Sequence, residues 1–198
     1  MGYPIRFKMN IPNGLSILRI LLVPVFVALY LKGIQPGQEA LQYWSFVVLA
    51  LSGLTDCFDG MIARRFHQIT DLGKILDPVA DKMTQMAVLI CLVVHYPRLL
   101  PLLIICVCKE LGQLIGSAIM LHRGAAIQGA KWYGKLTTIV FYLVMAAFVL
   151  WGDRMNWIVM LVLGGGLGIL MLFAFFNYVK VFLGAKKEMD RKRDVSDR

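Results

Sequence analysis

The chain has 198 residues, of which 59% are hydrophobic and 17% are charged, and its formal net charge is +9. A soluble domain carries about 25% charged residues, whereas the apolar residues here fall in runs of about 20, the length that spans a bilayer. Composition therefore excludes an ordinary soluble domain and predicts one polytopic membrane bundle.

The apolar runs predict an all-α fold with six transmembrane helices, because a span in lipid must satisfy its backbone hydrogen bonds internally. The expected spans are residues 14–31, 41–59, 77–95, 99–121, 134–151 and 156–180. Residues 3–13 mix apolar and basic side chains and are expected to form a short interfacial segment on the inner membrane surface. Residues 1–185 are thus the predicted membrane domain, and residues 186–198 a frayed, polar cytoplasmic tail.

Lysine and arginine are unevenly distributed over this plan. Of the 21 basic residues, 17 fall on the side of the N-terminus, and Lys109 lies inside the fourth span. The opposite side holds only Lys32, Arg98 and Arg154. The positive-inside rule then predicts that both termini are cytoplasmic, in a bacterial cytoplasmic membrane. We expect no nucleic-acid partner, because no basic stripe is interleaved with exposed aromatic residues.

Two pairs of aspartates mark the junction of the second and third spans. Asp56 and Asp59 are three residues apart and Asp77 and Asp81 are four apart, so each pair shares one face of a helix. Four anions this close need counter-charge. Protonation, a divalent metal and pairing with neighbouring cations are all open, and those cations are Arg64, Arg65, Lys74 and Lys82. Carboxylates without histidine or thiolate would suit Mg²⁺, Mn²⁺ or Ca²⁺.

Small and basic residues surround these aspartates at fixed spacing. The pattern D-x-x-D-G-x-x-A-R, then eight residues, then G-x-x-x-D-x-x-x-D resembles the signature of the CDP-alcohol phosphatidyltransferase family. All its fixed positions are present: Asp56, Asp59, Gly60, Ala63, Arg64, Gly73, Asp77 and Asp81. The resemblance implies a membrane enzyme that moves a phosphatidyl group from CDP-diacylglycerol to an alcohol and releases CMP.

The family resemblance also implies roles for the signature residues. The metal site, for two Mg²⁺ or Mn²⁺ ions, would be formed by Asp56, Asp59, Asp77 and Asp81, and Asp81 would also take the acceptor's proton. The remaining positions, Gly60, Ala63, Arg64 and Gly73, would contact the CDP moiety of the donor. Membrane lipids and a second copy of the chain, in a homodimer, are the other expected partners.

The acceptor is expected to be glycerol 3-phosphate, because residues 9–26 and 76–82 resemble those of phosphatidylglycerophosphate synthases. CDP-dependent cardiolipin synthases, which use phosphatidylglycerol, share both stretches and stay open as an alternative. Thr137 and Ser117 stand where glycerophosphate-using members would carry a second lysine and an arginine, which favours the alternative. The candidate acceptor-binding residues are Lys109, Arg123, Lys131 and Lys135.

Lys109 and its neighbour Glu110 allow two interpretations. Ionisable residues in mid-span are functional by default, and the pair resembles an Arg-Glu pair of the glycerophosphate-using enzymes. An internal salt bridge is the structural alternative. A divalent-metal transporter is the remaining non-enzyme class, but the sequence lacks its expected acidic residues on several helices and its inverted repeat.

Overall fold

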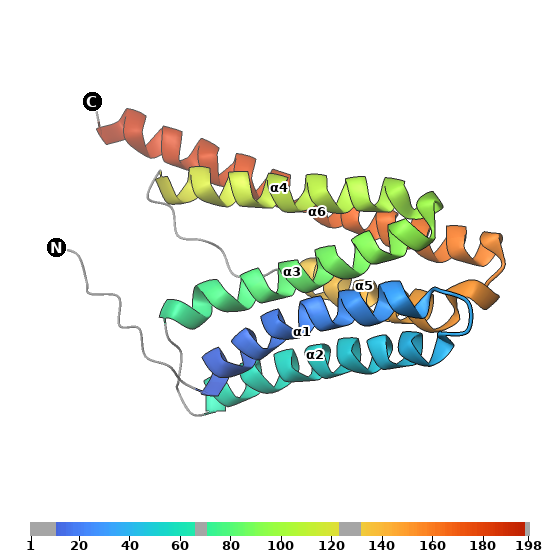
Figure 1. Cartoon of the computed structure of the whole chain (residues 1–198). Helices are drawn as coiled ribbons and strands as arrows, with labels where there is room; N and C mark the ends of the chain where they lie inside the picture. Colours follow the sequence, from blue (N-terminus) through green and yellow to red (C-terminus); the bar gives the residue numbers. More distant parts are fainter. Residues whose placement is uncertain (1–10, 66–70, 123–131, 197–198) are drawn as a thin grey trace. The chain divides into compact units, whose positions relative to one another are not determined.

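The structure, a computed structural model, describes residues 11–65, 71–122 and 132–196. These residues form six α-helices and two short 3-10 turns, Pro97–Leu99 and Gly152–Arg154 (Figure 1). The α-helices are α1 (Ile11–Gly33), α2 (Glu39–Arg65), α3 (Asp71–His95), α4 (Leu100–His122), α5 (Trp132–Trp151) and α6 (Trp157–Ser196). No strand occurs among the described residues, which agrees with the predicted all-α class.

Five stretches are long and apolar enough to cross a membrane. They are Asn13–Gly33, Leu76–His95, Pro97–Ile119, Trp132–Arg154 and Trp157–Gly184. Each coincides with a predicted span, and the predicted span at 41–59 coincides with α2, which is not among the five. Six helices are therefore present in the described chain, while six membrane crossings stay a prediction.

The C-terminal helix departs from the sequence prediction. α6 continues unbroken for 40 residues to Ser196, so the expectation of a frayed end from residue 186 is wrong for residues 186–196. The physical reason lies in composition: residues 185–196 contain no glycine or proline, and eight of the twelve are lysine, arginine, alanine, glutamate or methionine, which favour helix. At the other end, α1 begins at Ile11, and most of the predicted interfacial segment lies outside the described residues.

The chain divides into two compact units, and the first comprises Met1–Pro97 with Met145–Arg154. In this unit α1 packs along both α2 and α3 (Figure 1). Its apolar contacts come from buried side chains such as Phe26 on α1, Leu49 on α2, and Val88 and Leu92 on α3. α1 thus contacts both helices that carry the family signature, α2 and α3.

Polar side chains join the helices of the first unit at the end where α1 finishes. The Tyr30 hydroxyl lies 3.2 Å from His95 Nδ1, and His95 Nε2 lies 3.3 Å from Asp153 Oδ1. Tyr96 donates a 2.7 Å hydrogen bond to the same oxygen, and Gln42 Nε2 donates to Asp153 Oδ2 at 3.3 Å. This network holds the end of the unit that is remote from Asp77 and Asp81.

The second unit comprises Arg98–Val144 with Met155–Arg198, and in it α4 lies along α6 (Figure 1). Rings from α6 occupy the space that glycines of α4 leave open. A Cβ on Gly112 would lie 2.4 Å from Phe175 Cε2, and one on Gly116 would lie 2.6 Å from Phe182 Cε2. Small residues therefore allow these helices to approach closely, as is common in membrane bundles.

Candidate functional site

Two of the four predicted aspartates have described side chains, and α3 positions both. Asp77 and Asp81 are one helical turn apart and partly exposed, with the buried Ala80 beside them. Gln85, a further turn along, is buried and donates a 2.9 Å hydrogen bond from Nε2 to Asp81 Oδ2. This bond restricts rotation of the Asp81 carboxylate, and sequence reasoning had not selected Gln85.

A buried polar stripe on α1 faces this part of α3. Asn13, Ser16 and Arg19 are spaced by three residues, and each is at most 1% exposed. The Ser16 hydroxyl donates a hydrogen bond to Asp77 Oδ1, which ties α1 to α3. None of the three was assigned to the site from sequence, although polar residues at helical spacing inside an apolar span were the signal that could have found them.

Arg19 is a charged residue that is buried in the apolar part of α1. From the sequence it counts only as one of the basic residues on the cytoplasmic side, but it lies inside Asn13–Gly33, a stretch apolar enough to cross a membrane, and is 1% exposed. The contact of Ser16 with Asp77 places Arg19, three residues later, level with Ala80 and Asp81. A buried guanidinium is strongly destabilising without counter-charge, and Asp77 and Asp81 are the acidic residues of α3 nearest to this level.

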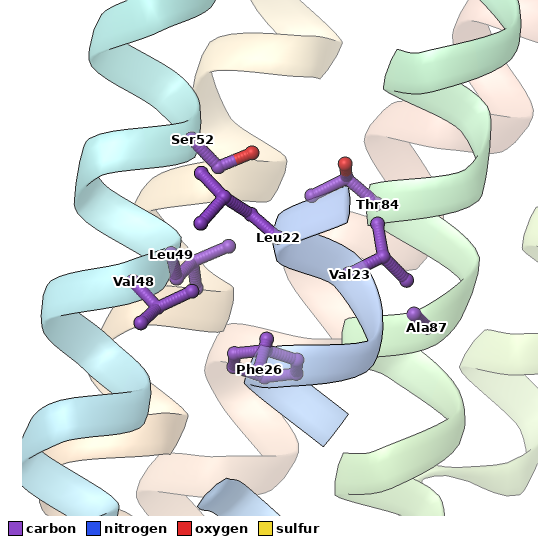
Figure 2. Close-up of a pocket in the computed structure, with 8 residues that line it drawn as sticks. All are labelled: Leu22, Val23, Phe26, Val48, Leu49, Ser52, Thr84 and Ala87. Carbon is purple, nitrogen blue, oxygen red and sulfur yellow. The ribbon is translucent and has the colours of Figure 1, made fainter. Parts of the chain in front are cut away.

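A small cavity lies between α1, α2 and α3, one turn farther from the aspartates than Arg19. Its lining residues are Leu22, Val23, Phe26, Val48, Leu49, Ser52, Thr84 and Ala87 (Figure 2). Figure 2 shows Ser52 of α2 and Thr84 of α3 on either side of α1, with Phe26 toward the other end of the pocket. The volume of about 10 Å³ is room for one water at most. The cavity is therefore too small to bind a substrate.

The α2 half of the signature lies at the same end of the first unit. Ser52 and Thr84 line one cavity, and Asp56 follows Ser52 by one turn, while Asp81 precedes Thr84 by about one turn. Because α2 and α3 run in opposite directions, the signature residues of both helices lie on the same side of the cavity. The side chains of the remaining α2 positions, Asp56, Asp59, Gly60, Ala63 and Arg64, lie outside the described part, and Gly73 is buried near the start of α3.

The acceptor candidates that the structure describes belong to the second unit. Lys109 Nζ lies 2.5 Å from Glu110 Oε1, and these side chains are 11% and 15% exposed, so the two form an internal ion pair. Lys135 is exposed on α5. Thr137 is buried and donates a 2.8 Å hydrogen bond to the Tyr133 carbonyl within its own helix. Arg123 and Lys131 lie outside the described residues.

The chemistry of the donors indicates which cation the first unit could hold. Asp77 and Asp81 offer carboxylate oxygens, the ligands that Mg²⁺, Mn²⁺ and Ca²⁺ prefer. Among the described side chains, which do not include those of Asp56 and Asp59, no group of three or more histidine, cysteine, aspartate or glutamate residues is placed to hold a metal. The donors thus fit a hard divalent cation in kind, and a complete site would need the α2 aspartates.

Comparison with known proteins identifies the protein family. A model of the CDP-alcohol phosphatidyltransferase family matches residues 9–176, from before α1 to within α6. The chain belongs to this family. Membership confirms the resemblance seen in the signature, makes the protein a phosphotransferase enzyme and argues against the transporter alternative. Together with the five apolar helices, it also indicates an integral membrane protein.

Relatives of this phosphatidyltransferase carry two kinds of name. A cardiolipin synthase (CMP-forming) of Streptomyces coelicolor is 34% identical over 154 residues, covering 76% of this chain and 69% of the relative. A CDP-diacylglycerol–glycerol-3-phosphate 3-phosphatidyltransferase of Pseudomonas fluorescens is 41% identical over 96 residues, covering 46% and 45%. A probable phosphatidylglycerophosphate synthase of Mycobacterium tuberculosis is 34% identical over 144 residues, covering 71% and 66%. The chain therefore spans from about half to about two thirds of the lengths of these relatives.

Proposed function

We propose that this protein transfers a phosphatidyl group from CDP-diacylglycerol to glycerol 3-phosphate, forming phosphatidylglycerophosphate and releasing CMP. The observation that carries the proposal is the family match over residues 9–176, combined with a signature in which every fixed position is present. The names of the Pseudomonas and Mycobacterium relatives support this acceptor.

The four signature aspartates would hold Mg²⁺ or Mn²⁺, as two ions. Oxygen-only donors suit these cations, and members of the family generally depend on a divalent metal. When bound, the ions would supply positive charge against the phosphoryl oxygens of the donor. Ser16 and Gln85 hold the two described carboxylates of this set, Asp77 and Asp81, by hydrogen bonds.

The small signature residues and Arg64 would bind the CDP moiety. Gly60, Ala63 and Gly73 carry little or no side chain, so a pyrophosphate could approach the helix backbone there. Arg64 is permanently charged and can grip a phosphate through two parallel hydrogen bonds. The donor phosphates and the signature aspartates are all anionic, so bound cations would neutralise both. This supports binding of the metal and the nucleotide together.

The reaction itself requires one proton acceptor from the chain. Asp81 would take the proton of the acceptor hydroxyl, whose oxygen forms a new bond to the β-phosphorus of CDP-diacylglycerol. The bond between that phosphorus and the bridging oxygen breaks, and CMP leaves with the bonding electrons. Gln85 would keep the Asp81 carboxylate in a fixed orientation through the hydrogen bond to Oδ2, which positions the base for general-base catalysis.

We place this reaction at the cytoplasmic face of a bacterial cytoplasmic membrane. The excess of basic residues on the side of the N-terminus supports cytoplasmic termini, and the donor's acyl chains could stay in the bilayer while its nucleotide enters from water. We also propose that the protein works as a homodimer. Cross-linking in the membrane would test that, since a monomer at all protein concentrations would contradict it.

Phosphatidylglycerol is the second candidate acceptor, which would make the protein a CMP-forming cardiolipin synthase. Two observations favour it: the name and coverage of the Streptomyces relative, and the burial of Thr137 where a phosphate-binding lysine is expected. Its hydroxyl is bonded within α5 and adds no positive charge for an acceptor phosphate.

One experiment separates the two acceptors. Purified protein with CDP-diacylglycerol and Mg²⁺ is offered glycerol 3-phosphate or phosphatidylglycerol, and the lipid products are identified by mass spectrometry. We expect phosphatidylglycerophosphate from the first acceptor. Cardiolipin from the second, with no product from the first, would replace the first proposal by the second.

A further inference from the structure

Ser16 makes a hydrogen bond that differs from those of other helical hydroxyls in the first unit. Serine and threonine inside helices commonly bond to a carbonyl of their own helix. Thr84 does so with Ala80, Ser45 bonds to the Gln42 carbonyl, and Thr55 bonds to the Ser52 carbonyl. Ser16 instead donates across the interface between α1 and α3, to a carboxylate oxygen of Asp77.

The location of this bond restricts the carboxylate that receives it. Ser16 is fully buried, at 0% exposure, and lies on the face of α1 that also carries Asn13 and Arg19. Asp77 is partly exposed, so one side of its carboxylate is held by the protein interior while the other can meet a ligand. The hydroxyl engages Oδ1 and leaves Oδ2 for that ligand.

We propose that Ser16 is a positioning residue that orients Asp77 for divalent-metal binding, and this inference rests on the proposed function. Carboxylates that bind metals are themselves held by hydrogen bonds, and loss of such an outer partner typically lowers metal affinity or activity by about 10–100-fold. α1 carries none of the family signature, yet through Ser16 it takes part in the metal site.

The test compares the full-length purified protein with Ser16→Ala, Ser16→Thr and Ser45→Ala. Ser16→Thr keeps the hydroxyl, and Ser45→Ala makes the same chemical change at another buried serine, 0% exposed, on α2. Mn²⁺ affinity is measured by electron paramagnetic resonance, and thermal unfolding is followed without metal. CMP release is then titrated with Mg²⁺.

We expect Ser16→Ala to weaken Mn²⁺ binding by about 10–100-fold and to shift the Mg²⁺ titration by a similar factor, with turnover largely recovered at saturating metal. Ser16→Thr should bind Mn²⁺ nearly as wild type does. Ser45→Ala should leave Mn²⁺ affinity unchanged, so that any effect is confined to thermal stability. A merely structural role would lower the unfolding temperature of Ser16→Ala without changing its Mn²⁺ affinity, and that result would overturn the inference.

The failure of the inference can be told apart from failure of the proposed function. If wild-type protein releases CMP in a metal-dependent way and Ser16→Ala has wild-type Mn²⁺ affinity, only the role of Ser16 is refuted. If wild-type protein neither binds Mn²⁺ nor releases CMP from CDP-diacylglycerol, both proposals are refuted.

Discussion

Replacing Lys109 with methionine is expected to destabilise the protein severely. The change removes a cation 2.5 Å from Glu110 Oε1 and leaves a carboxylate whose side chain is only 15% exposed. Breaking a buried ion pair by removing one partner typically costs about 3–5 kcal/mol. At about 2–4 °C per kcal/mol for a chain of this size, the unfolding temperature should fall by about 10 °C.

The double variant Lys109→Met/Glu110→Leu is the matched control, because replacing both partners of a buried pair with apolar residues is often neutral or stabilising. Unfolding in detergent is followed by tryptophan fluorescence, and the single variant Glu110→Leu completes the double-mutant cycle. A loss of less than about 1 kcal/mol in Lys109→Met, a value typical of an exposed pair, would refute this reasoning. Full stability of the double variant with a raised KM for the acceptor would show that the pair also binds substrate.

Three further predictions concern packing and pH. Ser52→Ala should stabilise the protein by about 1–3 kcal/mol in chemical unfolding, because the buried Ser52 hydroxyl has no hydrogen-bond partner among the described residues; a destabilised variant would contradict this. Gly112→Ala should cost about 1–3 kcal/mol through overlap with Phe175, whereas Gly165→Ala, with open space around it, should be neutral or slightly stabilising. Burial and the hydrogen bond to Asp153 raise the pKa of Tyr96. Stability from a raised pKa is full below the unfolded value, near 10, and is lost as pH rises toward the folded value, so Tyr96→Phe should flatten the fall in unfolding temperature between pH 10 and 11.

Helix positions were readable from the sequence because lipid permits few alternatives for an apolar run of about 20 residues. All six predicted segments coincide with helices. The prediction of a frayed end is wrong for residues 186–196 because polarity does not by itself disfavour helix; helix propensity depends on the absence of glycine and proline and on side-chain type.

The family signature on α2 and α3 was also readable, because its spacing is a property of local sequence. The contribution of α1 was not, since the bond from Ser16 to Asp77 joins residues 61 apart in the chain. Arg19 shows the same limit: its charge was counted correctly, but its burial depends on packing against neighbouring helices. Gln85 was missed because an amide inside an apolar helix has no distinctive chemistry until its partner, Asp81, is seen.

The most direct test of metal-dependent phosphatidyl transfer is CMP release from CDP-diacylglycerol by the purified protein, measured with Mg²⁺, with chelator and after Mg²⁺ is restored. Glycerol 3-phosphate and phosphatidylglycerol are both supplied, so that acceptor choice does not affect the result. We predict CMP release with Mg²⁺, loss in chelator, recovery on addition of Mg²⁺, and no release by Asp81→Asn. Undiminished release in chelator, or by Asp81→Asn, would contradict the proposed site.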